Sequence, residues 1–170
     1  NRVETLIHKG TSALQHGSRM VVGPLKKLER SWEKVFGKYN GNVQALLDVC
    51  RMTVVCDTAE MLAELTELLE AYPEILDCCR VKMRLHPCYD TTESGGYRDI
   101  LINVRIPVGG DDVWHLCELQ LTIKPILEIK NSGAHTMYGL ARVVGLLDPA
   151  VHTLNGDIEE PTALARVTAG

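Results

Sequence analysis

Apolar and polar residues alternate along two neighbouring stretches in the middle of the chain. Every second residue from 100 to 106 is apolar, which predicts a strand with one buried face. Residues 107–112 are rich in Pro, Gly and Asp and predict a turn, and residues 114–123 then alternate again. We therefore expect a β-hairpin. Its second face carries charged and amide side chains from both strands: Asp99, Asn103, Arg105, Glu118 and Gln120.

Helical spacing dominates the N-terminal part of the chain. Apolar residues over 1–17 predict a helical hairpin, and we expect an N-terminal helical arm over residues 1–23. Gly23-Pro24 opens a further predicted helix. The apolar stripe of this helix is expected to consist of Leu25, Leu28, Trp32 and Val35. Its other face gathers cations, which suit either a solvated helix face or a triphosphate: Lys26, Lys27, Arg30 and Lys34.

Strands and helices alternate through the rest of the chain. Residues 50–57 predict a strand, and Thr58 is expected to cap a helix over residues 59–71 that covers a sheet. Another strand within residues 75–85 places Arg80, Lys82 and Arg84 on one side, where like charges repel unless an anion lies among them. Helices are predicted from Pro125 and over residues 135–147, with a break at residues 131–133 between them, and residues 151–170 suggest a tail or linker.

This order predicts an α/β (α+β) fold in one domain over residues 1–150, with a single mixed β-sheet of four to five strands flanked by helices. One sheet face is expected to lie under helices, and the other to collect the cations and carboxylates. Such a face fits a nucleoside triphosphate with Mg²⁺, because carboxylates hold the metal and cations neutralise phosphates. The glycine motifs of P-loop and Rossmann proteins are absent, so neither class is supported.

Composition narrows the function classes. A formal net charge of -4 argues against a general binder of nucleic acid or membrane surfaces, whose affinity rests on excess Lys and Arg. No apolar run is long enough to span a bilayer, so we expect no membrane partner. The six cysteines form no C-x-x-C pair, which favours reduced thiols and a cytoplasmic location.

Four short motifs carry a resemblance to a known family. They are Asp48-Val49-Cys50-Arg51, Arg80-Val81-Lys82-Met83-Arg84, Gly96-Tyr97-Arg98 and Glu118-Leu119-Gln120, with a weaker fifth in Gly133-Ala134-His135 and Tyr138. With these motifs in this order and on these predicted elements, the chain from Pro24 to Arg142 resembles the RelA/SpoT synthetase domain of the alarmone synthetases. The resemblance implies that the chain is a divergent member of this family, with the polymerase-β-like nucleotidyltransferase fold.

The resemblance implies transfer of pyrophosphate from ATP to the 3′-hydroxyl of GDP or GTP, with Mg²⁺ as cofactor. It implies that Glu118 is the catalytic base or hydroxyl orienter and that Asp48 binds the metal together with it. The donor phosphates would be held by cations from three elements: Arg30, Lys34, Arg51, Lys82 and Arg84. The acceptor would be bound by Tyr97, through stacking on its base, and by Arg98, Gln120 and His135.

Two departures from the family pattern leave the acceptor and the activity open. Asp48 precedes Arg51 by three positions where the family usually has five, and Leu101 stands where bacterial synthetases usually carry His. The alternatives are an enzyme that modifies adenine nucleotides, a toxin or effector that pyrophosphorylates the 3′ end of tRNA, and an inactive nucleotide-binding sensor.

The site residues also have simpler explanations. Glu118 could pair with Arg105 across the hairpin, and Tyr97 could pack at a strand end. His135 could pack between helices, and Asp48 could cap the element that it precedes.

Overall fold

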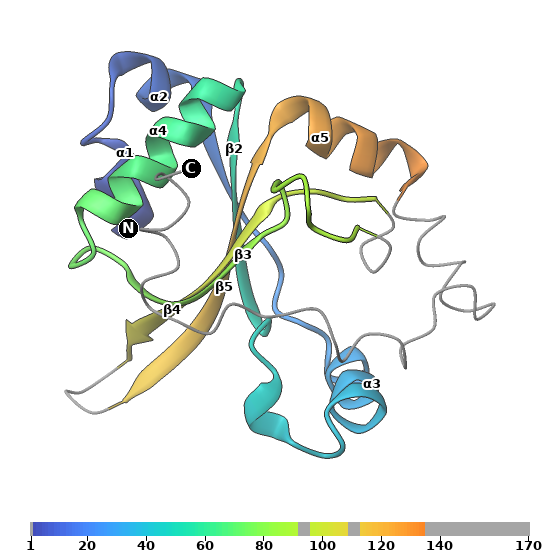
Figure 1. Cartoon of the computed structure of the whole chain (residues 1–170). Coiled ribbons are helices and arrows are strands. Elements are labelled where there is room, and N and C mark those ends of the chain that lie inside the picture. Colours follow the sequence, from blue (N-terminus) through green and yellow to red (C-terminus); the bar gives the residue numbers. More distant parts are fainter. Residues whose placement is uncertain (1, 92–95, 109–112, 135–170) are drawn as a thin grey trace.

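A five-stranded mixed sheet forms the centre of the computed structural model, which describes residues 2–91, 96–108 and 113–134 (Figure 1). The strands are β1 (Ser18–Val22), β2 (Cys50–Cys56), β3 (Asp77–Met83), β4 (Ile100–Pro107) and β5 (Trp114–Ile123). Their spatial order is β1-β2-β5-β4-β3, with β2 and β5 parallel and the other neighbours antiparallel. The predicted fold class and the β4–β5 hairpin are confirmed.

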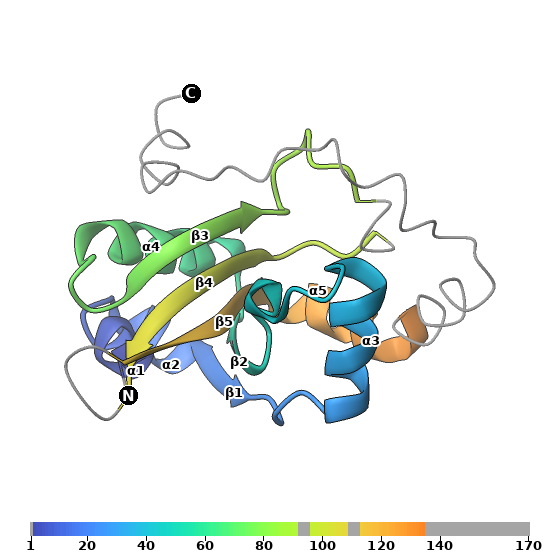
Figure 2. The same cartoon turned by 90° about the horizontal axis from the view of Figure 1, so that it is seen from below.

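Helices lie on both sides of this sheet (Figures 1 and 2). One side carries α1 (Arg2–Ile7), α2 (Ser12–Gly17) and α4 (Ala59–Ala71), the other carries α5 (Lys124–Ile129), and α3 (Leu28–Lys38) lies beyond the end of the sheet. Two short segments complete the described chain: the 3-10 turn Val43–Ala45 and the kinked segment Lys130–Ala134.

The hydrophobic core lies between the sheet and the first group of helices. Six of its leucine, isoleucine and valine side chains are at most 1% exposed and come from six different elements: Leu6, Leu14, Val54, Leu65, Ile102 and Leu121. Burying each such side chain contributes about 1.5–3 kcal/mol, so this layer supplies most of the driving force for folding. The predicted cover helix α4 is confirmed, and the side chain of Thr58 caps it by accepting a hydrogen bond from the Met61 amide.

The predicted N-terminal helical arm ends earlier than expected. Residues 18–22 form the edge strand β1, because their backbone pairs antiparallel with β2 from Ser18 opposite Cys56 to Val22 opposite Met52. The helix expected at Pro24 begins only at Leu28. Hydrogen bonds from the Gly23 amide to the Arg51 carbonyl and from the Lys26 amide to the Val49 carbonyl hold the intervening residues against the chain that leads into β2.

The predicted apolar stripe of α3 is mostly exposed. Val35 is buried, whereas Leu28 and Trp32 are 67% and 51% exposed. Leu25 precedes the helix and is 68% exposed. The reason is the position of α3, which lies beyond the end of the sheet, away from α4 and the core (Figure 2).

The second face of the hairpin is more buried than an open polar face. Asp99, Leu101 and Asn103 are all buried, because α5 and the segment after it lie over this side of the sheet. Pro125 lies in the first turn of α5, as predicted, and the predicted break near Gly133 is confirmed by its positive φ of 116°. The predicted helix over 135–147, the predicted tail and the boundary at residue 150 lie outside the described residues.

Two expectations from composition can be compared with the described chain. All six cysteines are free thiols. None of the helices within the described ranges has the length and apolar character needed to cross a membrane.

Candidate active site

Strand register places the charged residues of three strands in one row on the same sheet face. Arg51 of β2 lies directly opposite Glu118 of β5, Glu118 lies opposite Asn103 of β4, and Asn103 lies opposite Arg80 of β3. Side chains opposite one another in a sheet point to the same face. The polar face predicted from alternation is therefore confirmed as a continuous surface across the sheet.

The next row brings a further predicted cation onto this face. Gln120 lies opposite Leu101, and Leu101 lies opposite Lys82. Lys82 is thus two strands away from the strand that carries Glu118, on the same side of the sheet. Apolar side chains of the same strands, such as Val81 and Leu119, point to the other side and pack in the core.

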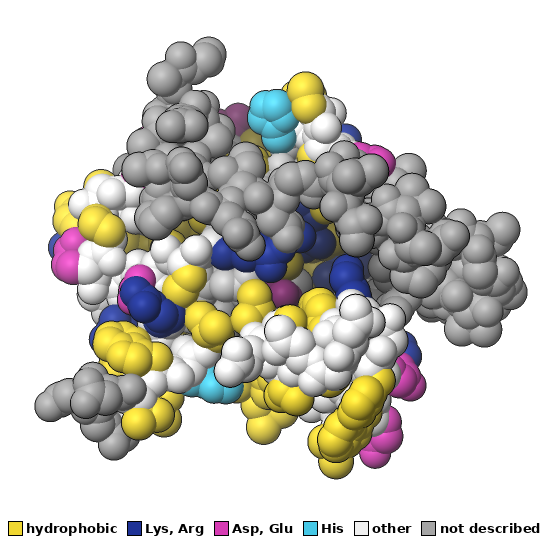
Figure 3. Space-filling model, turned by 60° about the horizontal axis from the view of Figure 1, so that its bottom comes forward, with side chains coloured by type: hydrophobic (Ala, Val, Ile, Leu, Met, Phe, Trp, Pro, Cys, Tyr) yellow, Lys and Arg dark blue, Asp and Glu magenta, His cyan; other side chains and the backbone are white. Residues whose placement is uncertain are grey.

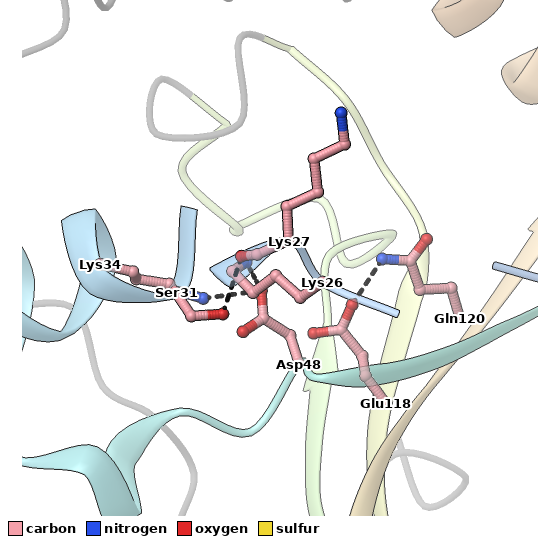
Figure 4. Close-up of polar contacts among 7 residues, drawn as sticks. All are labelled: Lys26, Lys27, Ser31, Lys34, Asp48, Glu118 and Gln120. Carbon is pink, nitrogen blue, oxygen red and sulfur yellow. Dashed lines mark hydrogen bonds and ion pairs between the residues drawn. The ribbon is translucent and has the colours of Figure 1, made fainter. Parts of the chain in front are cut away.

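Asp48 lies just before β2 and is held by two lysines from the segment that contains α3 (Figure 4). Its Oδ2 accepts hydrogen bonds from Lys26 Nζ at 2.6 Å and Lys34 Nζ at 3.0 Å. Burial by itself raises the pKa of Asp48, but these two hydrogen bonds outweigh burial and hold the pKa below its ordinary value. The other oxygen, Oδ1, is buried and has no hydrogen-bond partner among the described residues.

Glu118 points toward Asp48 from the neighbouring strand (Figure 4). Gln120, two residues further along β5, donates its Nε2 hydrogen to Glu118 Oε1 at 2.8 Å. Burial raises the pKa of Glu118, and the negative charge of Asp48 raises it further. The hydrogen bond from Gln120 and the charge of Lys34 offset part of this rise.

A second charged cluster lies at the other end of the polar face. Arg84 donates its Nε hydrogen to Asp99 Oδ1 at 2.6 Å, and the Asp99 side chain is fully buried. Lys130 Nζ lies 4.3 Å from the centre of the Tyr97 ring, and Arg84 contacts the same ring at 5.9 Å. Burial lowers the pKa of Lys130, and the positive charges of Arg84 and Arg51 lower it further. The negative charges of Asp99 and Glu118 oppose this effect, so Lys130 lies among four charged side chains.

Several buried polar atoms on this face lack partners within the described chain. They are Arg51 Nε, Asn103 Nδ2 and Asp48 Oδ1. Buried polar groups are nearly always hydrogen-bonded, so water or ligand atoms are expected to complete the hydrogen bonds of this cluster. In Figure 3 Lys and Arg side chains gather in the middle of this side of the molecule, around an acidic side chain.

The structure brings most of the predicted site residues together. Those on or beside the polar face are Asp48, Glu118, Lys34, Arg51, Lys82, Arg84, Tyr97 and Gln120. Arg30 lies apart, because its side chain is 66% exposed and pairs with Glu33 at 2.6 Å. Arg98 donates to the carbonyl oxygens of Arg84 and His86, which anchors the segment after β3, and His135 lies outside the described residues.

The simpler explanation for Glu118 is wrong. Arg105 pairs with Asp77 of β3, its Nε lying 2.8 Å from Oδ2, and the residue opposite Glu118 is Asn103. Mid-strand pairing with Arg105 therefore does not account for a carboxylate at position 118.

Three residues of the face make contacts that the sequence did not predict. Lys26 was noted only as one of four cations, since its approach to Asp48 depends on the extended segment before α3. Asp99 was placed on the correct face, but its burial against Arg84 was not predicted. Lys130 could have been suspected as a lone cation directly before the predicted helix break, yet its position over Tyr97 depends on how α5 crosses the sheet.

No protein-family model matches the sequence, and no curated protein matches it either. Solved structures do match. Small alarmone synthetase 1 from Bacillus subtilis bound to its product pppGpp has a TM-score of 0.58 at 18% identity, over 75% of this chain and 65% of that one. Small alarmone synthetase 2 from the same organism has a TM-score of 0.56 at 16% identity, over 74% of this chain and 64% of that one.

A further match shows the same architecture in another organism. The smu.1046c protein from Streptococcus mutans has a TM-score of 0.53 at 16% identity, over 89% of this chain and 83% of that one. The chain spans about 65% of the length of the Bacillus proteins that it matches. The likeness confirms the fold that the four sequence motifs indicated: this chain has the fold of the small alarmone synthetases.

Proposed function

We propose that this chain is a pyrophosphokinase that transfers pyrophosphate from ATP to the 3′-hydroxyl of GDP or GTP. The observation that carries the proposal is the polar face itself, where two facing carboxylates lie beside a row of cations on a fold shared with alarmone synthetases. Phosphoryl-type transfers need alignment and charge neutralisation more than covalent chemistry from the protein, and this face offers both.

Glu118 is the proposed base for the attacking hydroxyl. Its raised pKa makes it a stronger proton acceptor than an ordinary carboxylate, and the hydrogen bond from Gln120 fixes one of its oxygens. The other oxygen is then available to accept the proton of the 3′-hydroxyl. Asn103 and Arg51, on either side of Glu118 in the same row, lie where they can orient the two substrates.

The cations of β3 and the residues after it are proposed to bind the donor phosphates. Arg80, Lys82 and Arg84 follow one another along a single side of this strand and its extension. Charge-assisted hydrogen bonds from guanidinium groups to phosphate are among the strongest that proteins form. Tyr97 is proposed to position the acceptor base, and its present contact with Lys130 implies that this lysine moves aside or binds a phosphate when the base stacks.

Asp48 and Glu118 are the residues proposed to hold Mg²⁺. The fit is supported by the buried Oδ1 of Asp48, which has no partner among the described residues, and by the raised pKa of Glu118, which results from burial and then from the charge of Asp48. When bound, the metal supplies neutralisation of phosphate charge. Lys26 and Lys34 occupy the other oxygen of Asp48 and keep that carboxylate ionised and directed at the site.

The acceptor is proposed to be a guanine nucleotide. The Bacillus synthetase that this fold resembles is bound to pppGpp as its product. The test is incubation of the purified chain with ATP labelled at the γ-phosphate, Mg²⁺ and a panel of GDP, GTP, adenine nucleotides and tRNA, followed by thin-layer separation. We expect label in the guanine nucleotides.

A Glu118→Gln variant should lower kcat by about 10²-fold or more, because the amide cannot accept the proton. The matched control is Glu67→Gln, an exposed acid of α4 on the other side of the sheet, which should keep the full rate. Full activity in Glu118→Gln would contradict the assignment. Label in tRNA alone would establish the RNA-modifying alternative, and nucleotide binding without turnover would establish the sensor.

A further inference from the structure

Two cysteines and a histidine come together on the side of the sheet opposite the polar face. Cys50, the first residue of β2, lies directly across the parallel pairing from Cys117 of β5. His115 precedes Cys117 by two residues on the same strand, so its side chain points to the same face. His115 Nε2 lies 3.2 Å from Cys50 Sγ.

The three ligand atoms have the spacing of a metal site. All of them lie within 4.8 Å of one another, and all three residues are half-buried, so solvent reaches the cluster. A tetrahedral Zn²⁺ with bonds of about 2.3 Å to sulfur and about 2.0 Å to nitrogen separates its ligand atoms by about 3.6–3.8 Å. Small rotations about the side-chain bonds are enough to reach this geometry.

The donor set determines which metal fits. Two thiolates and an imidazole are soft ligands that favour Zn²⁺, whereas Mg²⁺ and Ca²⁺ require oxygen ligands. We propose that Cys50, His115 and Cys117 form a zinc site, with water as the fourth ligand. This site is separate from the two carboxylates, because Glu118 points to the other face of β5 and Asp48 lies just before β2.

Zinc at this position would fix the start of the β2–β5 pairing. The pair Cys50–Cys117 comes one residue before the pair Arg51–Glu118, whose side chains belong to the polar face. A metal that joins the two strands here resists their separation and keeps Arg51 and Glu118 in register. Binding is therefore expected to stabilise the folded chain, because the three ligands converge only when the strands pair.

Titration of the reduced, metal-free chain with Co²⁺ tests the proposal. We expect one Co²⁺ per chain, a thiolate-to-cobalt charge-transfer band and loss of this band when Zn²⁺ is added. Binding should also release about two protons per metal, one from each thiol. Zinc at about a hundredfold excess over its dissociation constant should raise the melting temperature by roughly 5–10 °C.

Variants assign the ligands. Cys50→Ser, His115→Ala and Cys117→Ser should each lose the temperature shift, and the serine variants should lose the charge-transfer band. The matched control is Cys79→Ser combined with Cys88→Ser, two exposed thiols outside the cluster, and it should keep both signals. His115→Ala removes a half-buried side chain near the hairpin end and serves if a cysteine variant does not fold.

Three results would overturn the zinc site. The first is a folded, reduced wild-type chain that binds no Co²⁺. The second is a charge-transfer band that persists in Cys50→Ser and disappears in the control. The third is a Cys50–Cys117 disulfide in the freshly purified chain, found by peptide mapping, together with no metal binding after reduction.

Discussion

The ion pair between Arg84 and Asp99 allows the clearest quantitative test of the structure. Asp99 is completely buried, and the side chain of Arg84 is only 16% exposed. Replacing Arg84 by Met keeps most of the apolar stem but leaves a buried carboxylate without its closest cation. Breaking a buried pair in this way costs about 3–5 kcal/mol.

We expect Arg84→Met to lower the free energy of unfolding by about 3 kcal/mol, at the lower end of that range. The reason is Lys130, whose charge also favours ionised Asp99 and partly replaces that of Arg84. For a chain of this size the loss corresponds to a fall in melting temperature of about 6–12 °C. Urea denaturation followed by far-ultraviolet circular dichroism measures the free energy of unfolding directly.

The loss should depend on pH in a definite direction. Burial raises the pKa of Asp99 in the folded chain, against the opposing effect of Arg84, and removing the cation raises this pKa further. Between the unfolded and folded pKa values the folded state binds more protons, so its stability falls as pH rises through that window. The difference between wild type and Arg84→Met should therefore be larger at about pH 8 than at about pH 5.

Two further variants separate the buried pair from general charge effects. Arg84→Met combined with Asp99→Leu should recover most of the lost stability, because no uncompensated charge remains. Arg105→Met is the matched control: its pair with Asp77 is exposed, so its removal should change stability within the error of the measurement. The reasoning is refuted if Arg84→Met loses no more than Arg105→Met, or if the double variant is no more stable than the single one.

Three other predictions concern the core, a thiol and the lysine contacts. Leu65→Ala should lower the free energy of unfolding by about 3 kcal/mol, because its side chain is 1% exposed at the centre of the core; urea denaturation checks this. Burial raises the pKa of Cys56 to about 11, so in the native chain Cys56 should stay unmodified by iodoacetamide at neutral pH while the exposed Cys88 reacts, as peptide mass spectrometry would show. The pKa of Asp48 is lower in the folded chain than in the unfolded chain, so its charge stabilises the fold above the unfolded pKa, and this stability is lost as pH falls through the folded pKa. Because Lys34→Met removes one of the two cations that lower this pKa, the variant should lose less stability than the wild type on acidification, as melting temperatures at different pH would show.

Elements whose signal is local were predicted correctly from the sequence. The bounds of α4 agree with the helical spacing, and its cap at Thr58 follows from the hydroxyl directly before the apolar pattern. Strand β2 agrees because it is rich in β-branched and apolar residues. The β4–β5 hairpin agrees because alternation continues over several residues on both sides of the turn. The same alternation placed Lys82 and Glu118 on one face, although β3 contains an irregularity between Cys78 and Arg80.

Features that depend on distant contacts were not predicted. Strand β1 is short and lies at the sheet edge, and only its pairing with β2 distinguishes it from the end of a helical arm. The apolar residues of α3 have helical spacing, which cannot reveal that the helix lies away from the core, with Trp32 and Phe36 stacked on each other at the surface. Likewise, spacing along α5 does not show that Lys130 approaches Tyr97.

The distribution of charge explains why net charge is a poor guide to the ligand of this chain. The formal value of -4 argues against an anionic partner when the chain is treated as uniform. The acids of α4, however, are on the helix that covers the opposite side of the sheet: Glu60, Glu64, Glu67 and Glu70. On the polar face the cations of β2, β3, α3 and the segment after α5 outnumber the carboxylates, and burial weakens the screening of their charge by solvent. This distribution supports the proposal that the face binds a compact, highly charged anion such as a nucleoside triphosphate, because the acidic helix opposes the extended contact that a nucleic acid would need.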